Sequence, residues 1–175
     1  MGILVVVGII ILGILSMYNS LVMRKNKIKQ AKSSIDVYLM QRFDLIPNLV
    51  ECVKGYMKHE QAVLEKVTAL RSNYQETKDL KSGAKLNTIC NSMIGLAESN
   101  PDLKASEQFL ELQKSLSKME SQLQAARRIY NSEVTVYNTK IAMVPMNMIA
   151  SLFHFQEEEL FEAEAGAKEK IEMDL

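Results

Sequence analysis

Residues that interrupt helices are scarce in this sequence, and tryptophan is absent. Only seven glycines and three prolines occur among 175 residues, although hydrophobic residues make up 47% of the chain. No strict alternation of apolar and polar residues lasts long enough to predict a sheet. Because long apolar segments with few breakers are typical of helices, we predict an all-α fold with very long helices.

Signatures of catalysis are also missing. The sequence contains no P-loop, no dinucleotide-binding fingerprint and no His-Glu-x-x-His pair. Neither His59 nor His154 follows a glutamate three residues earlier, as a di-iron helical bundle requires. The acidic run at 157–159 lies near His154 and offers oxygen ligands for a hard cation, but such runs are more often solvated faces. We therefore predict no enzymatic activity, no metal and no other cofactor.

Charge is unevenly distributed along the chain, although the net charge is zero. Five basic residues and no acid lie between residues 24 and 32, whereas acids dominate after residue 157. The basic residues adjoin an apolar segment, and the rest of the chain is acidic. This pattern favours a membrane surface over nucleic acid as the basic cluster's partner.

The apolar segment at 3–15 is the first candidate functional feature, since eleven of its thirteen residues are Ile, Leu or Val. The run continues less purely to Met23, and about 20 residues at about 1.5 Å each cross a bilayer core of about 30 Å. Residues 18–20 would then lie near the headgroups. A cleaved signal peptide needs a basic segment before the run and a small-residue site after it, and both are missing. We predict a permanent transmembrane anchor at 1–23.

The orientation of this anchor follows from the basic residues behind it. By the positive-inside rule, they place the C-terminal side in the cytoplasm and the N-terminus outside. They are also candidate ligands for anionic lipid headgroups. These residues are Arg24, Lys25, Lys27, Lys29 and Lys32. Cys52 and Cys90 would face a reducing compartment, so we expect no disulfide, and we predict that both are small core residues.

After the anchor, apolar residues recur at steps of three and four, which predicts amphipathic helices. The stripes run over residues 28–74, 86–96 and 109–141, and a short fourth segment follows at 146–155. Breaks are predicted at 77–85, at 98–106 and at Pro145. Ser106 is a candidate N-cap for the third stripe. Stripes of this length must face each other, so we expect an antiparallel helical bundle.

Pro47 lies inside the first stripe, where proline costs roughly 3 kcal/mol. The three-and-four spacing keeps its phase across Pro47, and each buried Leu or Val contributes roughly 1.5 to 3 kcal/mol. We therefore predict a kinked but continuous helix. The alternative is a break, with Asp44 as the N-cap of a new helix and Pro47 in its first turn.

Several segments together resemble the bacterial LemA family. They are "SSIDV" at 33–37, "DLIPNLVECVKGYMKHE" at 44–60, "NPDLKAS" at 100–106, "ARRIYNSEVTVYN" at 126–138 and the stretch from Pro145 to "FHF" at 153–155. The resemblance runs from residue 1 to about 155 and leaves the acidic tail outside. It implies an antiparallel bundle of four helices on a single-pass anchor in the bacterial inner membrane. Some relatives look like parts of membrane-remodelling systems. Lys32 and Asn100 depart from the family, which often has Trp and Tyr there.

The residues that carry this resemblance are assigned structural roles. They are Ile35, Asp36, Asp44, Leu45, Pro47, Asn48, Leu49, Lys54, Gly55, Tyr56, Pro101, Leu103, Lys104, Arg127, Arg128, Tyr130, Asn131, Tyr137, Asn138, Pro145 and Asn147. Tyr130 and Tyr137 lie seven apart on one helix face, each followed by Asn. Because this repeat coincides with the apolar stripe, we interpret the tyrosines as seam residues whose hydroxyls are paired.

Two functions fit these patterns. The first is a non-enzymatic, membrane-anchored helical scaffold that forms homo-oligomers and organises or remodels the membrane. The alternative is an adaptor or regulator of another membrane protein, such as a protease or a signalling kinase. Its candidate contact surface is Met143, Met146, Met148, Phe153 and Phe155, since methionine makes adaptable interfaces. The predicted parts are the anchor at 1–23, the bundle at 24–155 and the acidic tail at 156–175, which is either an exposed helix or disordered.

Overall fold

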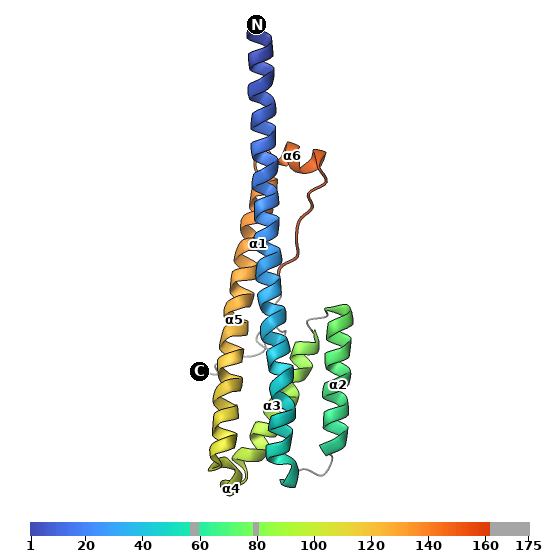
Figure 1. Ribbon diagram of the computed structural model, residues 1–175, viewed down its shortest axis with the longest axis vertical. Coiled ribbons are helices and arrows are strands. Elements are labelled where there is room, and N and C mark those ends of the chain that lie inside the picture. Colours follow the sequence, from blue (N-terminus) through green and yellow to red (C-terminus); the bar gives the residue numbers. More distant parts are fainter. Residues whose placement is uncertain (57–59, 79–80, 162–175) are drawn as a thin grey trace, which may run out of the picture. The chain divides into compact units, whose positions relative to one another are not determined.

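The computed structural model describes residues 1–56, 60–78 and 81–161, and all regular structure in these ranges is helical (Figure 1). The elements are α1 (Gly2–Val53), the 3-10 helix η1 (Lys54–Tyr56), α2 (Glu60–Thr77), α3 (Lys81–Glu98), α4 (Pro101–Lys104), α5 (Glu107–Ala142) and α6 (Met146–Leu152). The all-α prediction is confirmed. His59 and the acidic tail after residue 161 lie outside the described residues.

Helix α1 continues through Pro47, so the predicted continuous helix is confirmed and a new helix capped by Asp44 is excluded. Pro47 lies on the exposed side of the helix. Its neighbours Ile46, Leu49 and Val50 are almost completely buried. Burial of these aliphatic side chains offsets the hydrogen bond that the proline removes.

The prediction that the first helix reaches Tyr74 is wrong, because α1 ends at Val53 and α2 begins a new helix. The Tyr74 ring packs against Phe43 with centroids 6.0 Å apart, and its hydroxyl donates a hydrogen bond to Asp36. These contacts require the chain to reverse between α1 and α2. Gly55, a poor helix former, lies in η1 at this reversal. The three-and-four spacing of apolar residues is the same on both sides of this reversal because α1 and α2 each bury one face.

The three predicted breaks are confirmed, since α5 ends at Ala142 before Pro145, although the break at 77–85 is shorter than expected. Helix α2 ends with Lys78 in the left-handed region at φ 53°, and α3 already begins at Lys81. In the second break, Asn100 is extended, as the residue before a proline must be, and Pro101 starts α4. The Phe109 N–H donates to the Ser106 Oγ at 3.5 Å, so Ser106 caps α5 as predicted.

The described residues form two compact units that share α1 and α5. The first unit comprises residues 1–35 and 125–161, and the second comprises residues 36–124. The core of the first unit is Leu21, Ile28, Val134, Tyr137, Ile141, Ile149 and Ala150. The most buried residues of the second are Leu39, Phe43, Ile46, Leu49, Tyr74, Leu86, Met93, Phe109 and Leu123. Cys90 is buried in the second unit, Cys52 is half-buried, and both thiols are free.

Candidate functional site

The start of α1 presents an apolar surface on all sides. Its exposed large side chains are Ile3, Leu4, Val5, Val6, Val7, Ile9, Ile10, Ile11, Leu12 and Leu15. A continuous apolar surface of this kind marks a membrane or protein interaction site. By length and composition, α1 is a candidate membrane span, which agrees with the predicted anchor.

The five basic residues that follow the apolar run are divided into two groups. Arg24 forms an ion pair with Glu133 at 3.5 Å, and Lys25 forms one with Glu158 at 3.3 Å. The other three, at positions 27, 29 and 32, are exposed lysines. The exposed lysines are therefore the better candidates for headgroup contacts, while the first two also hold α5 and the tail against α1.

The first unit also contains a segment without regular structure that is held by two asparagines. We call residues 156–161 the tail segment; it runs from α6 back along α5 (Figure 1). The Asn138 amide donates to the Glu158 carbonyl at 2.8 Å and accepts from the Glu158 N–H at 3.0 Å. Asn131 makes the same pair of bonds with Phe161, at 2.9 Å and 2.7 Å. Each asparagine thus satisfies both main-chain groups of one residue, as a neighbouring strand would.

The tyrosine before each asparagine binds the same segment. The Tyr137 hydroxyl donates to the carbonyl of Gln156, and the Tyr130 hydroxyl donates to that of Glu159, both at 3.0 Å. Both hydroxyls are therefore paired, but with main-chain carbonyls of the tail segment and not with polar neighbours across a helix seam. Burial, followed by the nearby charge of Glu158, raises the pKa of both tyrosines, so the hydroxyls remain protonated donors.

The repeat lengths of helix and segment match. Seven residues of a helix rise about 10.5 Å, and three residues of an extended chain span roughly 10 Å. On α5, Asn131 and Asn138 therefore lie opposite Phe161 and Glu158, respectively. In the same way, Tyr130 and Tyr137 lie opposite Glu159 and Gln156. The Tyr-Asn repeat was visible in the sequence, but its partner was not, because main-chain groups leave no signal in a sequence pattern.

Arg127 lies at the Phe161 end of the contact between α5 and the tail segment. Its guanidinium lies over the Phe161 ring, 4.6 Å from the centroid, in cation–π geometry. Arg128, the next residue, is exposed. At the other end, His154 adopts a left-handed conformation at φ 56°. The Phe155 N–H reaches the Ala150 carbonyl at 2.9 Å, which ends α6 with a Schellman turn and directs the chain into the tail segment.

The five residues of the predicted contact surface around α6 differ in their exposure to solvent. Met143 and Met148 are exposed, and Phe153 is 45% exposed. Met146 and Phe155 instead pack against the core of the first unit. Val144 and Leu152, which were not among the predicted contact residues, are 78% and 66% exposed. The surface that remains open is therefore different from the one predicted.

The second unit contains an ion pair with a buried arginine. Arg42 is buried and forms an ion pair with Glu120. Cys90 lies beside this pair, and burial raises the pKa of its thiol more than Arg42 lowers it. A thiol with a raised pKa is a poor nucleophile, so this cluster has the properties of a structural ion pair.

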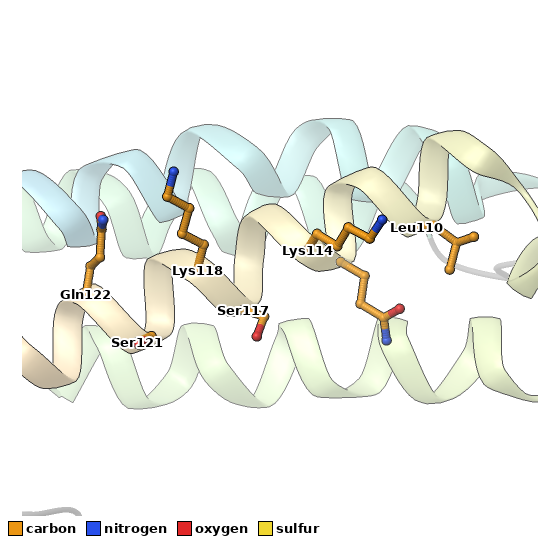
Figure 2. A pocket seen from close by; sticks show the side chains of 7 residues that line it. Leu110, Lys114, Ser117, Lys118, Ser121 and Gln122 are labelled. Carbon is orange, nitrogen blue, oxygen red and sulfur yellow. The ribbon is translucent and has the colours of Figure 1, made fainter.

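An open groove of about 700 Å³ follows one face of α5 in the second unit (Figure 2). Its lining is Leu110, Gln113, Lys114, Ser117, Lys118, Ser121 and Gln122. Figure 2 shows these side chains along α5, with the Lys118 amine and the Ser117 hydroxyl pointing away from each other. No carboxylate, imidazole or thiol is among these residues. Among the described residues, no three His, Cys, Asp or Glu side chains are grouped to hold a metal ion.

The other residues of the family motif lie at helix contacts and on the surface. Asp36 accepts the Tyr74 hydroxyl and lies 3.6 Å from Lys78, while Asp44 pairs with Arg71 at 2.7 Å. The buried motif residues are Ile35, Leu49 and Leu103, and Leu45 is half-buried. The exposed ones are Asn48, Lys54, Gly55, Tyr56, Pro101, Lys104, Pro145 and Asn147. The motif thus combines residues from both units.

A comparison with protein families identifies a match over residues 31–174 to the model of the LemA family. The chain belongs to the LemA family. It is also similar to Protein LemA of Metamycoplasma hominis, with 26% identity over 161 residues, covering 89% of this chain and 73% of that protein. The family match begins after the apolar run and includes the acidic tail, so the prediction that the tail lies outside the resemblance is wrong.

Proposed function

We propose that this LemA-family chain is a non-enzymatic, membrane-anchored scaffold that self-associates and organises the membrane. The observation that carries the proposal is the continuity of α1. One helix from Gly2 to Val53 contains the exposed apolar run and also supplies buried residues, such as Leu21 and Leu39, to both units. The residues of the proposed anchor and the residues that build both units thus belong to one continuous helix.

The finer architecture is part of the same proposal. The anchor covers residues 1–23, the antiparallel four-helix bundle covers 24–155 and the acidic tail covers 156–175. Reversed contacts support antiparallel packing within each unit: Ser20 with Lys140 and Arg24 with Glu133 in the first, and Asp44 with Arg71 in the second. The basic residues after the anchor favour the bacterial inner membrane with the N-terminus outside. A protease added to intact cells should then leave the C-terminal end uncut.

The test of self-association uses the full chain in mild detergent and in lipid vesicles. Light scattering in detergent should give a mass that is a multiple of one chain. Electron microscopy should show vesicles whose shape changes with protein density. A uniform monomer that leaves the vesicles unaltered would overturn the scaffold proposal.

Anionic headgroups are the proposed ligands of the exposed lysines in the basic cluster. Replacing Lys27, Lys29 and Lys32 with Gln should reduce the enrichment of a labelled anionic lipid around the protein, since each surface cation contributes about 1 kcal/mol. The matched control replaces Lys114 and Lys118, which are exposed lysines of the second unit. Equal enrichment for both variants would mean that the cluster only sets topology.

The adaptor function depends on the exposed apolar residues around α6. Photo-crosslinking from Met143 and Met148 in cells tests it against the scaffold. Crosslinks between copies support self-association, whereas one reproducible foreign protein supports an adaptor.

A further inference from the structure

Five apolar side chains around α6 remain open after the first unit has folded. Met143, Val144, Met148, Leu152 and Phe153 are 59%, 78%, 68%, 66% and 45% exposed. We call them the α6 surface. Exposed apolar residues occur singly on most proteins, but five within eleven residues form a patch that needs a partner.

The α6 surface lies beside the apolar part of α1. The Phe153 ring is 4.8 Å from the Tyr18 ring, and Phe155 is 5.7 Å from it. Ile14 and Met17 pack against the same core cluster as Ile149 and Ala150 of α6. Helix α6 is therefore placed at the level of residues 14–18 of α1, where it lies crosswise to that helix (Figure 1).

The length of the anchor determines how deep in the bilayer residues 14–18 of α1, and α6 beside them, would lie. The part of α1 that is free of other elements ends near Leu12, and its eleven residues rise only about 17 Å. A bilayer core measures about 30 Å, so the remaining distance has to be covered by the part from Gly13 to Met23. That part carries the contacts with α5 and α6. An anchor that spans the bilayer therefore brings α6 into the leaflet on its C-terminal side.

The distribution of side chains on α6 suits such a position. Met148 and Leu152 lie four residues apart and share a face, while Asn147 and Ser151 share another face about 100° away. Tyr18 and Phe153 add aromatic rings, which are enriched where hydrocarbon meets headgroups. An interfacial helix places its apolar face about 5 to 10 Å into that boundary, and its polar residues reach the headgroups.

We propose that the α6 surface is a second membrane contact, which inserts into the lipid leaflet on the C-terminal side of the anchor. Its occupants are the acyl chains next to the headgroups of that leaflet. The inference rests on the proposed anchor, because the depth of α6 is measured along α1. It adds a fixed wedge beside the span, so the protein displaces lipid in one leaflet more than in the other.

The test measures quenching of a fluorophore by lipids that carry bromine on their acyl chains. Single cysteines replace Met148 or Leu152 in the full chain, in a Cys52→Ser and Cys90→Ala background, and are labelled with an environment-sensitive dye. After reconstitution into vesicles, bromine near the headgroups should quench both positions several-fold more than it quenches the control. The matched control is Ile129→Cys, an apolar position of the same unit that is 57% exposed.

A label at Ile10 separates the failure of this inference from the failure of the anchor. Quenching at Ile10 by bromine near the bilayer centre, with Met148 and Leu152 as unquenched as Ile129, would overturn the α6 contact and leave the anchor intact. No quenching at Ile10 would overturn both. Dye shielding at Met148 that disappears when the protein is diluted with lipid would assign the surface to a second copy and overturn the inference.

A second variant tests the same membrane contact without a dye at Met148 or Leu152. With the label at Val144, the double change Met148→Glu and Leu152→Glu should reduce quenching to the level of Ile129, because charged groups resist entry into lipid. Both positions are exposed, so the fold is expected to persist, which circular dichroism can verify. Unchanged quenching at Val144 would contradict the insertion of α6.

Discussion

Two kinds of polar contact made by α5, one from each unit, work in different ways. In the first unit, Asn131 and Asn138 bind main-chain groups of the tail segment. In the second unit, Glu120 of α5 pairs with the side chain of Arg42 on α1. Side chains that bind a main chain fix the position of a segment whatever its residues are. A pair of charged side chains instead requires one particular residue on each helix and thereby selects their register.

The difference also predicts how each unit responds to damage. Loss of a buried ion-pair partner leaves a desolvated charge and affects the whole unit. Loss of an asparagine releases an irregular segment near the surface, while the helices keep their apolar core. Four substitutions test this contrast, and their expected effects decrease in the order given.

The largest effect is expected when Arg42 loses its partner. Glu120→Met should lower the free energy of unfolding by about 3 kcal/mol, at the lower end for a buried pair because the Glu120 side chain is 28% exposed. Denaturation of the full chain in detergent measures it. The double variant Arg42→Met and Glu120→Met should recover most of the loss, since an apolar pair replaces the charges. A double variant as unstable as the single one would refute this account.

A smaller and more local effect is expected at Asn138. Asn138→Leu removes two hydrogen bonds, each worth about 1 kcal/mol, from the main chain of Glu158. Amide exchange at Glu158 should accelerate by roughly ten-fold or more, while exchange of the Leu39 amide in α1 stays slow. Asn91→Leu, at an exposed position of α3, is the matched control. Similar protection of Glu158 in both variants would mean that the asparagine does not hold the segment.

The hydrogen bond from Tyr137 to the tail segment should contribute a stability that depends on pH. Tyr137→Phe removes the hydrogen bond to Gln156 and should cost about 1 kcal/mol at neutral pH. Burial raises the folded-state pKa of Tyr137 above its ordinary value near 10, so its stabilisation is complete below about pH 10 and is lost as the pH rises through the folded pKa. The stability gap to the Phe variant should therefore shrink in alkali. A gap that widens would contradict the assignment; Tyr56→Phe, at an exposed position, is the control.

The smallest effect is expected for the exposed ion pair of Asp44 and Arg71, whose side chains are 56% and 40% exposed. Asp44→Asn should change the free energy of unfolding by less than about 1 kcal/mol, and added salt should remove the difference. A salt-independent loss comparable to that of Glu120→Met would erase the distinction between buried and exposed pairs in the second unit.

Most of the fold could be predicted from the sequence because its signals are local. The apolar run, the three-and-four spacing of Leu116, Leu123 and Tyr137, and the turn at Asn100 each act within a few residues. The end of α1 at Val53 could not be predicted, since the apolar spacing is the same whether the chain continues or reverses. Only the contact of Tyr74 with Phe43 distinguishes these outcomes.

By itself, the sequence determined that the chain is helical and that it begins with a candidate membrane span, and it favoured a continuous helix at Pro47 over a break. The tertiary structure decided which residues those patterns meet. Hydrophobic periodicity specifies that a face is buried but not what buries it, because apolar burial has no direction. The pairing of Asn131 and Asn138 with Phe161 and Glu158 arises only when α6 turns the chain back along α5.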